Sequence, residues 1–252
     1  MLFQDKLRIA KSIIARTLPA YKTAVAWSGG KDSTAMLHMI MEVCDNFNYR
    51  FPDILFIDHN KHFDEIVETV ERFVEDNGLY MVVSTNKAIL DVDEMDIDAM
   101  DTGNRKELDR TGFAHKNLDL TLNSFEGNHL LKTVPMIKTI AERGYTALYT
   151  GIRASENGAR SQERYISPRG NHVRIHPVLA FTEDEIWTYI RQNKINVPSL
   201  YGKGYRSIDG VGTTFRLSSD PAWLQDRRIP ERAGRAQDKE KLMEKLRKWG
   251  YL

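Results

Sequence analysis

Short apolar runs alternate with segments of helical periodicity along most of the chain, and this alternation constrains the fold most strongly. Runs typical of buried strands are followed by patterns in which apolar residues recur every three or four positions. The alternation predicts an α/β fold, a parallel twisted sheet with helices on both faces. The expected strands are 23–27, 53–57, 79–84, 147–150 and 173–177, and the expected helices are 33–47, 65–75, 136–143 and one that begins at Thr182.

The alternation is interrupted in two places. Residues 91–128 are rich in Asp, Thr, Gly and Asn and are expected to form an insertion with a short helix or two. Their alternating Asp residues lack the glycine and glutamate positions of a calcium loop, so a solvated loop is favoured over a metal site. We therefore expect one α/β domain over 1–219, followed by an Arg-rich tail, 220–252, that is helical from about 237 to 249.

Composition limits the classes of protein to which the chain can belong. Lys and Arg total 36 against 35 Asp and Glu, so no basic excess indicates a nucleic-acid or membrane partner. The first 22 residues lack the apolar core of a signal peptide, and no stretch is long enough to span a bilayer, so we expect a cytoplasmic protein. Cys44, the single cysteine, lies on an apolar helix stripe, which predicts a buried thiol and no iron–sulfur cluster held by this chain alone.

The segment between the first expected strand and the first expected helix reads SGGKDS, residues 28–33. A Walker loop needs Ser or Thr directly after the lysine and a glycine five residues before Gly30, and both are missing. Two glycines nevertheless allow backbone N–H groups to close around an anion, aided by serine hydroxyls and the helix N-terminus. The anion-binding candidates are Ser28, Gly29, Gly30, Lys31 and Ser33, with only an auxiliary charge role expected for Lys31. Asp32 would fit among phosphates only with a divalent cation, so we expect Mg²⁺ there; a tight surface turn is the alternative.

This strand-loop-helix element resembles the PP-loop of the ATP pyrophosphatases, also called adenine nucleotide α-hydrolases. The resemblance implies a Rossmann-like sheet that binds ATP with Mg²⁺ and cleaves it between the α- and β-phosphates. AMP would pass to an acceptor while the loop holds the departing pyrophosphate. In such folds, ligands bind beyond the carboxyl ends of the strands, and the loop falls there.

Other segments are similar to the branch that contains PAPS reductases and the small subunit of sulfate adenylyltransferase. Asp58 ends the second strand, where the resemblance implies a ribose or metal contact, although His59 and Asn60 depart from the branch's Asp-Thr-Gly-like pattern. The branch's Gly-x-Arg-x-x-Glu-x-x-x-Arg segment matches Gly151, Arg153, Glu156 and Arg160. Guanidinium forks suit an oxyanion, so these arginines are candidates for holding the acceptor; a solvated arginine face is the alternative.

Several secondary candidates come from weaker matches. His129 and Lys132 are partly similar to a His and Lys-Thr segment of the adenylyltransferase subunit. His176, at the end of a strand, could be a general acid, but a structural hydrogen-bonding role is favoured. Arg232 and Arg235 resemble a Glu-Arg-x-Gly-Arg segment near the end of that subunit and could close over a nucleotide; a solvated basic turn is the alternative.

These resemblances lead to one functional hypothesis and two rivals. Reductases of the branch need a redox cysteine near the C-terminus, which is absent here, so we expect no thiol-dependent reduction. The leading hypothesis is adenylyl transfer to sulfate, with Asp32, Lys132, Arg153 and Arg160 as catalytic candidates and a separate GTPase large subunit as partner. The rivals are an ATP pyrophosphatase that activates another metabolite or nucleic-acid acceptor, and a nucleotide-binding subunit without turnover. The amino-acid sequence leaves open whether the chain forms homo-oligomers.

Overall fold

The computed structural model describes residues 1–156 and 158–235, and its main sheet has six strands in the order β3-β2-β1-β6-β8-β7. All neighbouring strands pair in parallel except β7 and β8, which are antiparallel. The α/β prediction is therefore confirmed, and only the antiparallel edge strand was missed. The strands are β1 (Thr23–Ala26), β2 (Asp53–Ile57), β3 (Met81–Ser84), β6 (Ala147–Thr150), β7 (Ile166–Arg169) and β8 (His172–Ile175).

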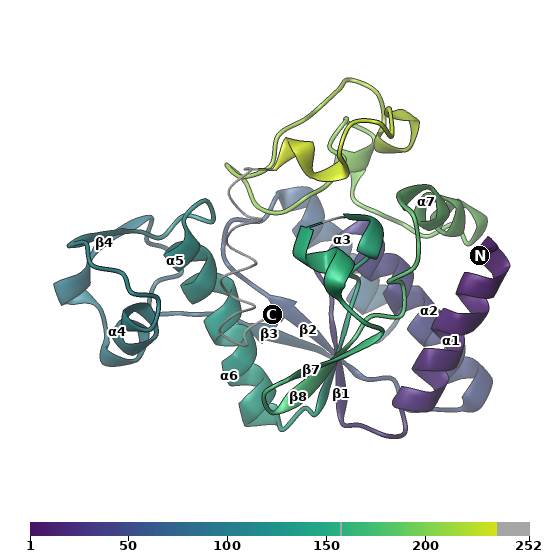
Figure 1. The fold of residues 1–252 in the computed structure, drawn as a ribbon, viewed down its shortest axis with the longest axis horizontal. Helices are drawn as coiled ribbons and strands as arrows, with labels where there is room; N and C mark the ends of the chain where they lie inside the picture. The colour runs from purple at the N-terminus through teal and green to yellow at the C-terminus, as the bar shows by residue number, and fades with distance from the viewer. Residues whose placement is uncertain (157, 236–252) are drawn as a thin grey trace.

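Helices pack on both faces of this sheet (Figure 1). One face is covered by α1 (Phe3–Thr17), α2 (Lys31–Phe47), α3 (Asp64–Asp76) and α7 (Glu183–Gln192), and the other by α6 (Val134–Arg143). The α7 helix, expected to begin at Thr182, starts with a capping box, in which the Thr182 hydroxyl accepts from the Glu185 N–H and the Glu185 carboxylate accepts from the Thr182 N–H. None of the described helices combines the length and apolar character needed to cross a bilayer.

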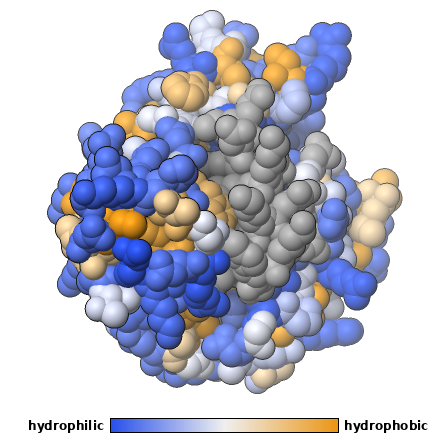
Figure 2. All heavy atoms as spheres, turned by 60° about the vertical axis from the view of Figure 1, so that its left-hand side comes forward, coloured by the Kyte–Doolittle hydropathy of each residue, from blue (hydrophilic) through white to orange (hydrophobic). Residues whose placement is uncertain are grey.

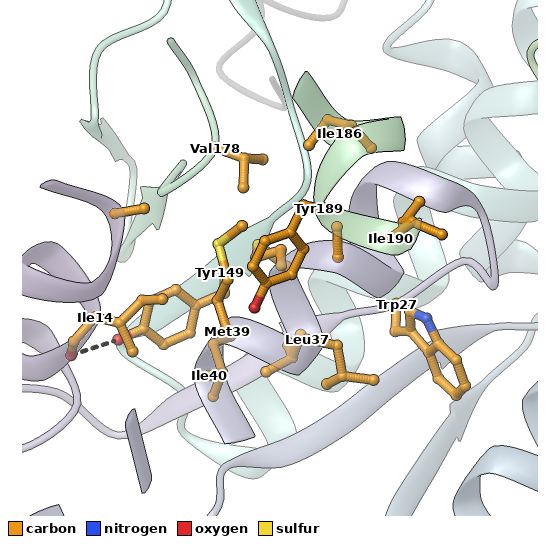
Figure 3. Close-up of a cluster of buried hydrophobic side chains, with 14 of the residues drawn as sticks. Ile14, Trp27, Leu37, Met39, Ile40, Tyr149, Val178, Ile186, Tyr189 and Ile190 are labelled. Carbon is orange, nitrogen blue, oxygen red and sulfur yellow. Dashed lines mark hydrogen bonds between the residues drawn. The ribbon is translucent and has the colours of Figure 1, made fainter. Parts of the chain in front are cut away.

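The larger core lies between the sheet and the α1, α2, α3 and α7 helices. In Figure 3, Tyr149 of β6 points toward α1, where its hydroxyl contacts the Ile14 carbonyl, and Met39 and Tyr189 lie beside it. The Tyr149 hydroxyl also lies 2.6 Å from the Thr17 hydroxyl, so its polar atom is satisfied inside the core. Cys44 is 4% exposed, as predicted, and burial raises the pKa of its thiol to about 11.

The insertion contains the expected short helices and, in addition, a two-stranded antiparallel ribbon. Its elements are β4 (Glu94–Asp96), α4 (Thr102–Asp109), β5 (Asn117–Asp119) and α5 (Phe125–Asn128), followed by a π-helix, His129–Thr133, that leads into α6. Buried leucines give it an apolar cluster separate from the main core. Figure 2 brings forward the side of the molecule on which the insertion lies. The surface there is mostly hydrophilic, with a small apolar area, in keeping with the Asp-rich composition of the insertion.

After α7, the chain crosses the sheet's carboxyl edge in a series of turns and short 3-10 helices. We call residues 220–235 the C-terminal strap; it is yellow in Figure 1. Trp223 of the strap packs edge-on against Trp187 of α7, with ring centroids 5.5 Å apart. The 3-10 helices of the chain are Ile97–Ala99, Ala154–Glu156, Gly158–Gln162, Ser199–Tyr201, Ala222–Leu224 and Glu231–Gly234. The helix expected from about 237 to 249 lies outside the described residues.

Candidate functional site

The glycine-rich loop joins β1 to α2 and is held close to the ends of β6 and α3. Gly29 has a φ of +72°, a left-handed conformation that glycine adopts without strain. At Gly151, just after β6, a Cβ atom would lie 2.6 Å from the Ser33 backbone nitrogen. The first turn of α2 therefore packs directly on the end of β6, which fixes the loop at the sheet's carboxyl edge.

A cavity of about 260 Å³ opens beside this loop. Six of the predicted residues at the loop and strand end line it, namely Ser28, Gly30, Lys31, Asp32, Ser33 and Gly151. Four predicted residues from farther along the chain also reach it, namely Lys132, Glu156, Arg160 and Arg235. Segments separated by up to about two hundred residues thus meet at one site, at the edge where α/β folds bind ligands.

Two buried basic side chains and two carboxylates form the centre of the site. The Lys31 side chain is 1% exposed, and its ammonium group pairs with Asp32 at 3.0 Å and with Glu231 of the strap. Arg153 is fully buried; its Nε lies 2.6 Å from Asp32 and its Nη2 lies 2.5 Å from Glu231. Lys31 is therefore a buried member of the network, a placement that the sequence did not predict.

A second pair extends the network toward the cavity. Arg160 lies 2.5 Å from Glu156, and oxygens of Glu156, Asp32 and Glu231 all lie within 4.8 Å of one another. Carboxylate oxygens are the donors that Mg²⁺ prefers, so this group fits that ion in donor type. Each carboxylate is already paired with Lys31, Arg153 or Arg160, however, so the cluster is electrically balanced.

The ion pairs keep the buried carboxylates charged. Burial alone would raise the pKa of Glu231, but the positive charges of Lys31 and Arg153 outweigh it and lower the pKa to about 2. For Lys31 the signs are reversed: burial alone would lower its pKa, but the negative charges of Asp32 and Glu231 raise the pKa above its usual value. Glu231 and Lys31 are therefore both ionised at neutral pH.

We expect acid to weaken the folded state through these carboxylates. The pKa of Glu231 is lower in the folded chain, about 2, than its ordinary value of 4.5. Its stabilising contribution is therefore complete above pH 4.5 and is lost as the pH falls toward 2. Urea unfolding at pH 7, 5 and about 3.5 measures this effect. An unfolding free energy that stays constant down to the lowest pH would contradict the charge assignments.

Other predicted residues lie away from the cavity lining. His176 is fully buried, with Nδ1 2.6 Å from the Thr150 hydroxyl and Nε2 3.5 Å from Glu163. His129 is also fully buried, with Nε2 3.6 Å from Glu107 of α4. The Asp58 carboxylate accepts a hydrogen bond from the Asn60 N–H at 2.9 Å and so shapes the turn after β2. Gly29 and Arg232 border the site without lining the cavity.

Several lining residues were not predicted. The Tyr201 hydroxyl accepts a hydrogen bond from the Lys31 N–H at 2.9 Å, at the N-terminus of α2. Asp209 pairs with Lys132, and the rings of His59 and His62 stack with centroids 3.8 Å apart. Tyr201 and Asp209 belong to the segment LYGKGYRSIDGVGTT, residues 200–214. This segment resembles a Leu-Tyr and Gly-Tyr-x-Ser-Ile stretch of the reductases, and that resemblance was a signal that could have placed it at the site.

Comparison with known proteins agrees with the sequence resemblance. A family model described as the phosphoadenosine phosphosulfate reductase domain matches residues 22–215. Sulfate adenylyltransferase subunit 2 of Mycobacterium sp. (strain JLS) is 26% identical over 205 residues, which cover 71% of this chain and 58% of that protein. The subunit of the same name from Mycobacterium bovis is 24% identical over 212 residues, which cover 74% of this chain and 60% of that protein. The chain thus matches about three fifths of the length of these relatives.

Solved structures show the same fold. Candida glabrata FMN adenylyltransferase in complex with FAD and inorganic pyrophosphate aligns with a TM-score of 0.67 at 16% identity, covering 92% of this chain and 87% of that one. Phosphoadenylyl-sulfate reductase from Candida auris aligns with a TM-score of 0.59 at 16% identity, covering 80% of this chain and 88% of that one. Because the family model spans most of the sequence, this chain belongs to the phosphoadenosine phosphosulfate reductase domain family of PP-loop proteins.

Proposed function

We propose that this chain transfers AMP from ATP to an oxyanion acceptor, sulfate, and releases pyrophosphate. The observation that carries the proposal is one cavity on the sheet's carboxyl edge that is lined by the glycine-rich loop with Lys31 and Asp32, and Arg153 lies next to it, paired with Asp32. Backbone N–H groups, serine hydroxyls and buried cations are the groups that bind phosphate oxygens. The fold and the adenylyltransferase relatives support this class of reaction.

In the proposed reaction, a sulfate oxygen attacks the α-phosphorus of ATP. A new oxygen–phosphorus bond forms while the bond from the α-phosphorus to the α–β bridging oxygen breaks, and that oxygen leaves with pyrophosphate. The chain's part is to hold the reactants in line and to neutralise charge on the leaving group, without a covalent intermediate. Mg²⁺, when bound, would neutralise phosphate charge, and Asp32 and Glu156, the carboxylates of this group that line the cavity, are the side chains suited to hold it.

Arg160 is the best candidate for holding the acceptor. One of its terminal nitrogens donates to Glu156, but its buried Nε atom has no hydrogen-bond partner within the described part of the chain. A buried guanidinium nitrogen without a partner is costly, and an oxyanion in the cavity would satisfy it. The naming of the relatives as subunit 2 supports a further proposal, that a separate GTPase subunit drives the uphill formation of the sulfate–AMP anhydride.

Replacing Arg160 with lysine should raise the KM for sulfate by about tenfold or more, because a charged hydrogen bond contributes about 1.5–3 kcal/mol. The Kd for ATP should change little. Arg169→Lys is the matched control, because Arg169 also pairs with a buried glutamate, Glu163, at 2.7 Å but lies outside the cavity. Equal sulfate KM values for the two variants would show that Arg160 does not hold the acceptor.

Product analysis tests the reaction itself. The chain is incubated with Mg²⁺, ATP labelled at the α-phosphorus, inorganic pyrophosphatase and sulfate, and the labelled products are identified by mass spectrometry. Pyrophosphatase hydrolyses the pyrophosphate product and so shifts the unfavourable equilibrium of adenylyl transfer toward the products. We expect adenosine 5'-phosphosulfate. Parallel incubations replace sulfate with FMN or transfer RNA, or supply phosphoadenylyl sulfate with a thiol reductant.

Each parallel incubation has a distinct meaning. A labelled adduct with FMN or RNA would keep the adenylyl-transfer class and replace the acceptor. Sulfite release with the thiol reductant would point to reduction, which the buried Cys44 thiol, with its pKa raised to about 11, does not favour. ATP binding without any labelled product, even with a GTPase subunit added, would favour a subunit without turnover.

A further inference from the structure

Glu231 reaches the glycine-rich loop from the C-terminal strap. Its carboxylate side chain is 8% exposed, accepts from Lys31 Nζ and also accepts from Nη2 of Arg153 through both oxygens. The other carboxylate on these two cations, Asp32, belongs to the loop's own helix. Of these two carboxylates, Glu231 is thus the one that the strap supplies.

The donors of these cations are already engaged in the described structure. Arg153 donates from Nε to Asp32, from Nη1 to Ser155 and from Nη2 to Glu231. Lys31 donates from Nζ to Asp32 and Glu231, and its backbone N–H donates to the Tyr201 hydroxyl. A phosphate group that used the Nε–Nη2 edge of Arg153 would have to replace Asp32 or Glu231, because the N–H groups of that edge are already donated. A carboxylate on a separate segment can leave without distortion of the loop.

The strap has two differently bonded parts. Near its start, the buried Arg206 holds it: Arg206 pairs with Glu183 of α7 at 2.7 Å and donates to the Asp226 and Ile229 carbonyls. Beyond Ile229, the 3-10 helix that carries Glu231 has short local bonds, including Ala233 N–H to the Pro230 carbonyl at 3.0 Å. The last residues of the strap are anchored again, because Gly234 accepts from the Phe215 N–H at 2.7 Å and Arg235 Nη2 donates to the Ile208 carbonyl at 2.6 Å. Departure of Glu231 would therefore disturb the 3-10 helix between these two anchored points and leave the start of the strap in place.

We propose that Glu231 is a built-in anion that occupies the phosphate-binding place on Lys31 and Arg153 in the nucleotide-free chain and exchanges with phosphate oxygens when ATP binds. This inference rests on the proposed function, because it takes the loop to be the phosphate site. The exchange replaces one anion with another on the same buried cations, so neither state leaves them unpaired. It also couples phosphate binding to the position of the strap end, residues 230–235.

The first test compares inorganic pyrophosphate binding to the wild-type chain and Glu231→Gln by calorimetry, with EDTA present so that no metal contributes. Glutamine keeps the shape but removes the competing charge, so we expect the Kd for pyrophosphate to fall by about tenfold or more. Glu163→Gln is the matched control: Glu163 is a buried, arginine-paired carboxylate outside the cavity, and its loss should leave the Kd unchanged.

The second test needs no variant. Hydrogen exchange with mass spectrometry on the wild-type chain should show faster exchange at the strap end when pyrophosphate is added, because the amides of Ala233 and Arg235 make the local bonds of the 3-10 helix that Glu231 must disturb to leave. The start of the strap, held by Arg206, should not change.

The outcomes separate this inference from the function on which it rests. If the wild-type chain binds pyrophosphate, but the Kd is not lowered in Glu231→Gln and the strap end exchanges no faster, the exchange of Glu231 is wrong and the phosphate site stands. If Glu163→Gln tightens binding equally, general loosening is the cause and the inference is again wrong. If neither the wild-type chain nor Glu231→Gln binds pyrophosphate, the loop is not a phosphate site, and the proposed function fails with the inference.

Discussion

Replacing Asp32 with asparagine should slow pyrophosphate release from ATP by about 100-fold or more, the scale of losing one charged group that stabilises a phosphoryl transition state. Asp32 accepts from Lys31 at 3.0 Å and from Arg153 at 2.6 Å, and it is the loop's own carboxylate, to which the proposed function assigns a role in holding Mg²⁺. Asparagine keeps the size of the side chain but leaves two buried cations with Glu231 as their shared counter-charge. A coupled pyrophosphate assay at saturating ATP measures the effect.

Asp45→Asn is the matched control for this substitution. Asp45 lies on the same helix, α2, but is exposed near its C-terminal end, so its neutralisation should leave the rate within about twofold of the wild-type value, as for most surface changes. Circular dichroism on both variants separates a catalytic loss from unfolding. A folded Asp32→Asn enzyme with more than a tenth of the wild-type rate and an unchanged Mg²⁺ requirement would overturn the role of Asp32.

The helices and buried strands were predictable because their signal is local. The expected strands 53–57 and 147–150 coincide with β2 and β6, and the helix expected from Ser33 begins two residues earlier, at Lys31. β7 was missed because it is a half-exposed edge strand that contains Pro168, so its apolar pattern is weak. Its hairpin with β8 carries a Gly-Asn turn, residues 170–171, and that pair was the signal that could have revealed it.

The site divides in the same way between local and distant parts. The loop is a contiguous motif, so its residues could be named from sequence. Glu231 meets Lys31 across 200 positions of sequence and Tyr201 meets it across 170. Neither pairing leaves a periodic or compositional trace, because it depends on where the strap crosses the sheet edge. The burial of Lys31 was not predicted for the same reason, since it follows from those distant partners.

Replacing Gly151 with alanine should lower the free energy of unfolding by about 1–3 kcal/mol and remove nucleotide binding. The new Cβ would lie 2.6 Å from the Ser33 nitrogen and 2.7 Å from its Cα, both backbone atoms that cannot rotate away. The first turn of α2 must therefore move off β6, which displaces the loop and Asp32 together. Urea unfolding measures the stability loss, and calorimetry with pyrophosphate measures the binding loss.

Gly30→Ala distinguishes this packing effect from a ligand effect at the same loop. A Cβ at Gly30 would meet the Ser28 hydroxyl at 3.4 Å and the Tyr201 hydroxyl at 3.5 Å, which are ordinary contacts, so we expect the unfolding free energy to change by less than about 0.5 kcal/mol. Gly30 lines the cavity, however, so its methyl group should hinder an anion that approaches the backbone and weaken pyrophosphate binding. If Gly30→Ala bound pyrophosphate as tightly as the wild-type chain while Gly151→Ala lost stability, the glycine at position 30 would serve the loop's conformation and the anion would have to lie nearer to Lys31 and Arg153.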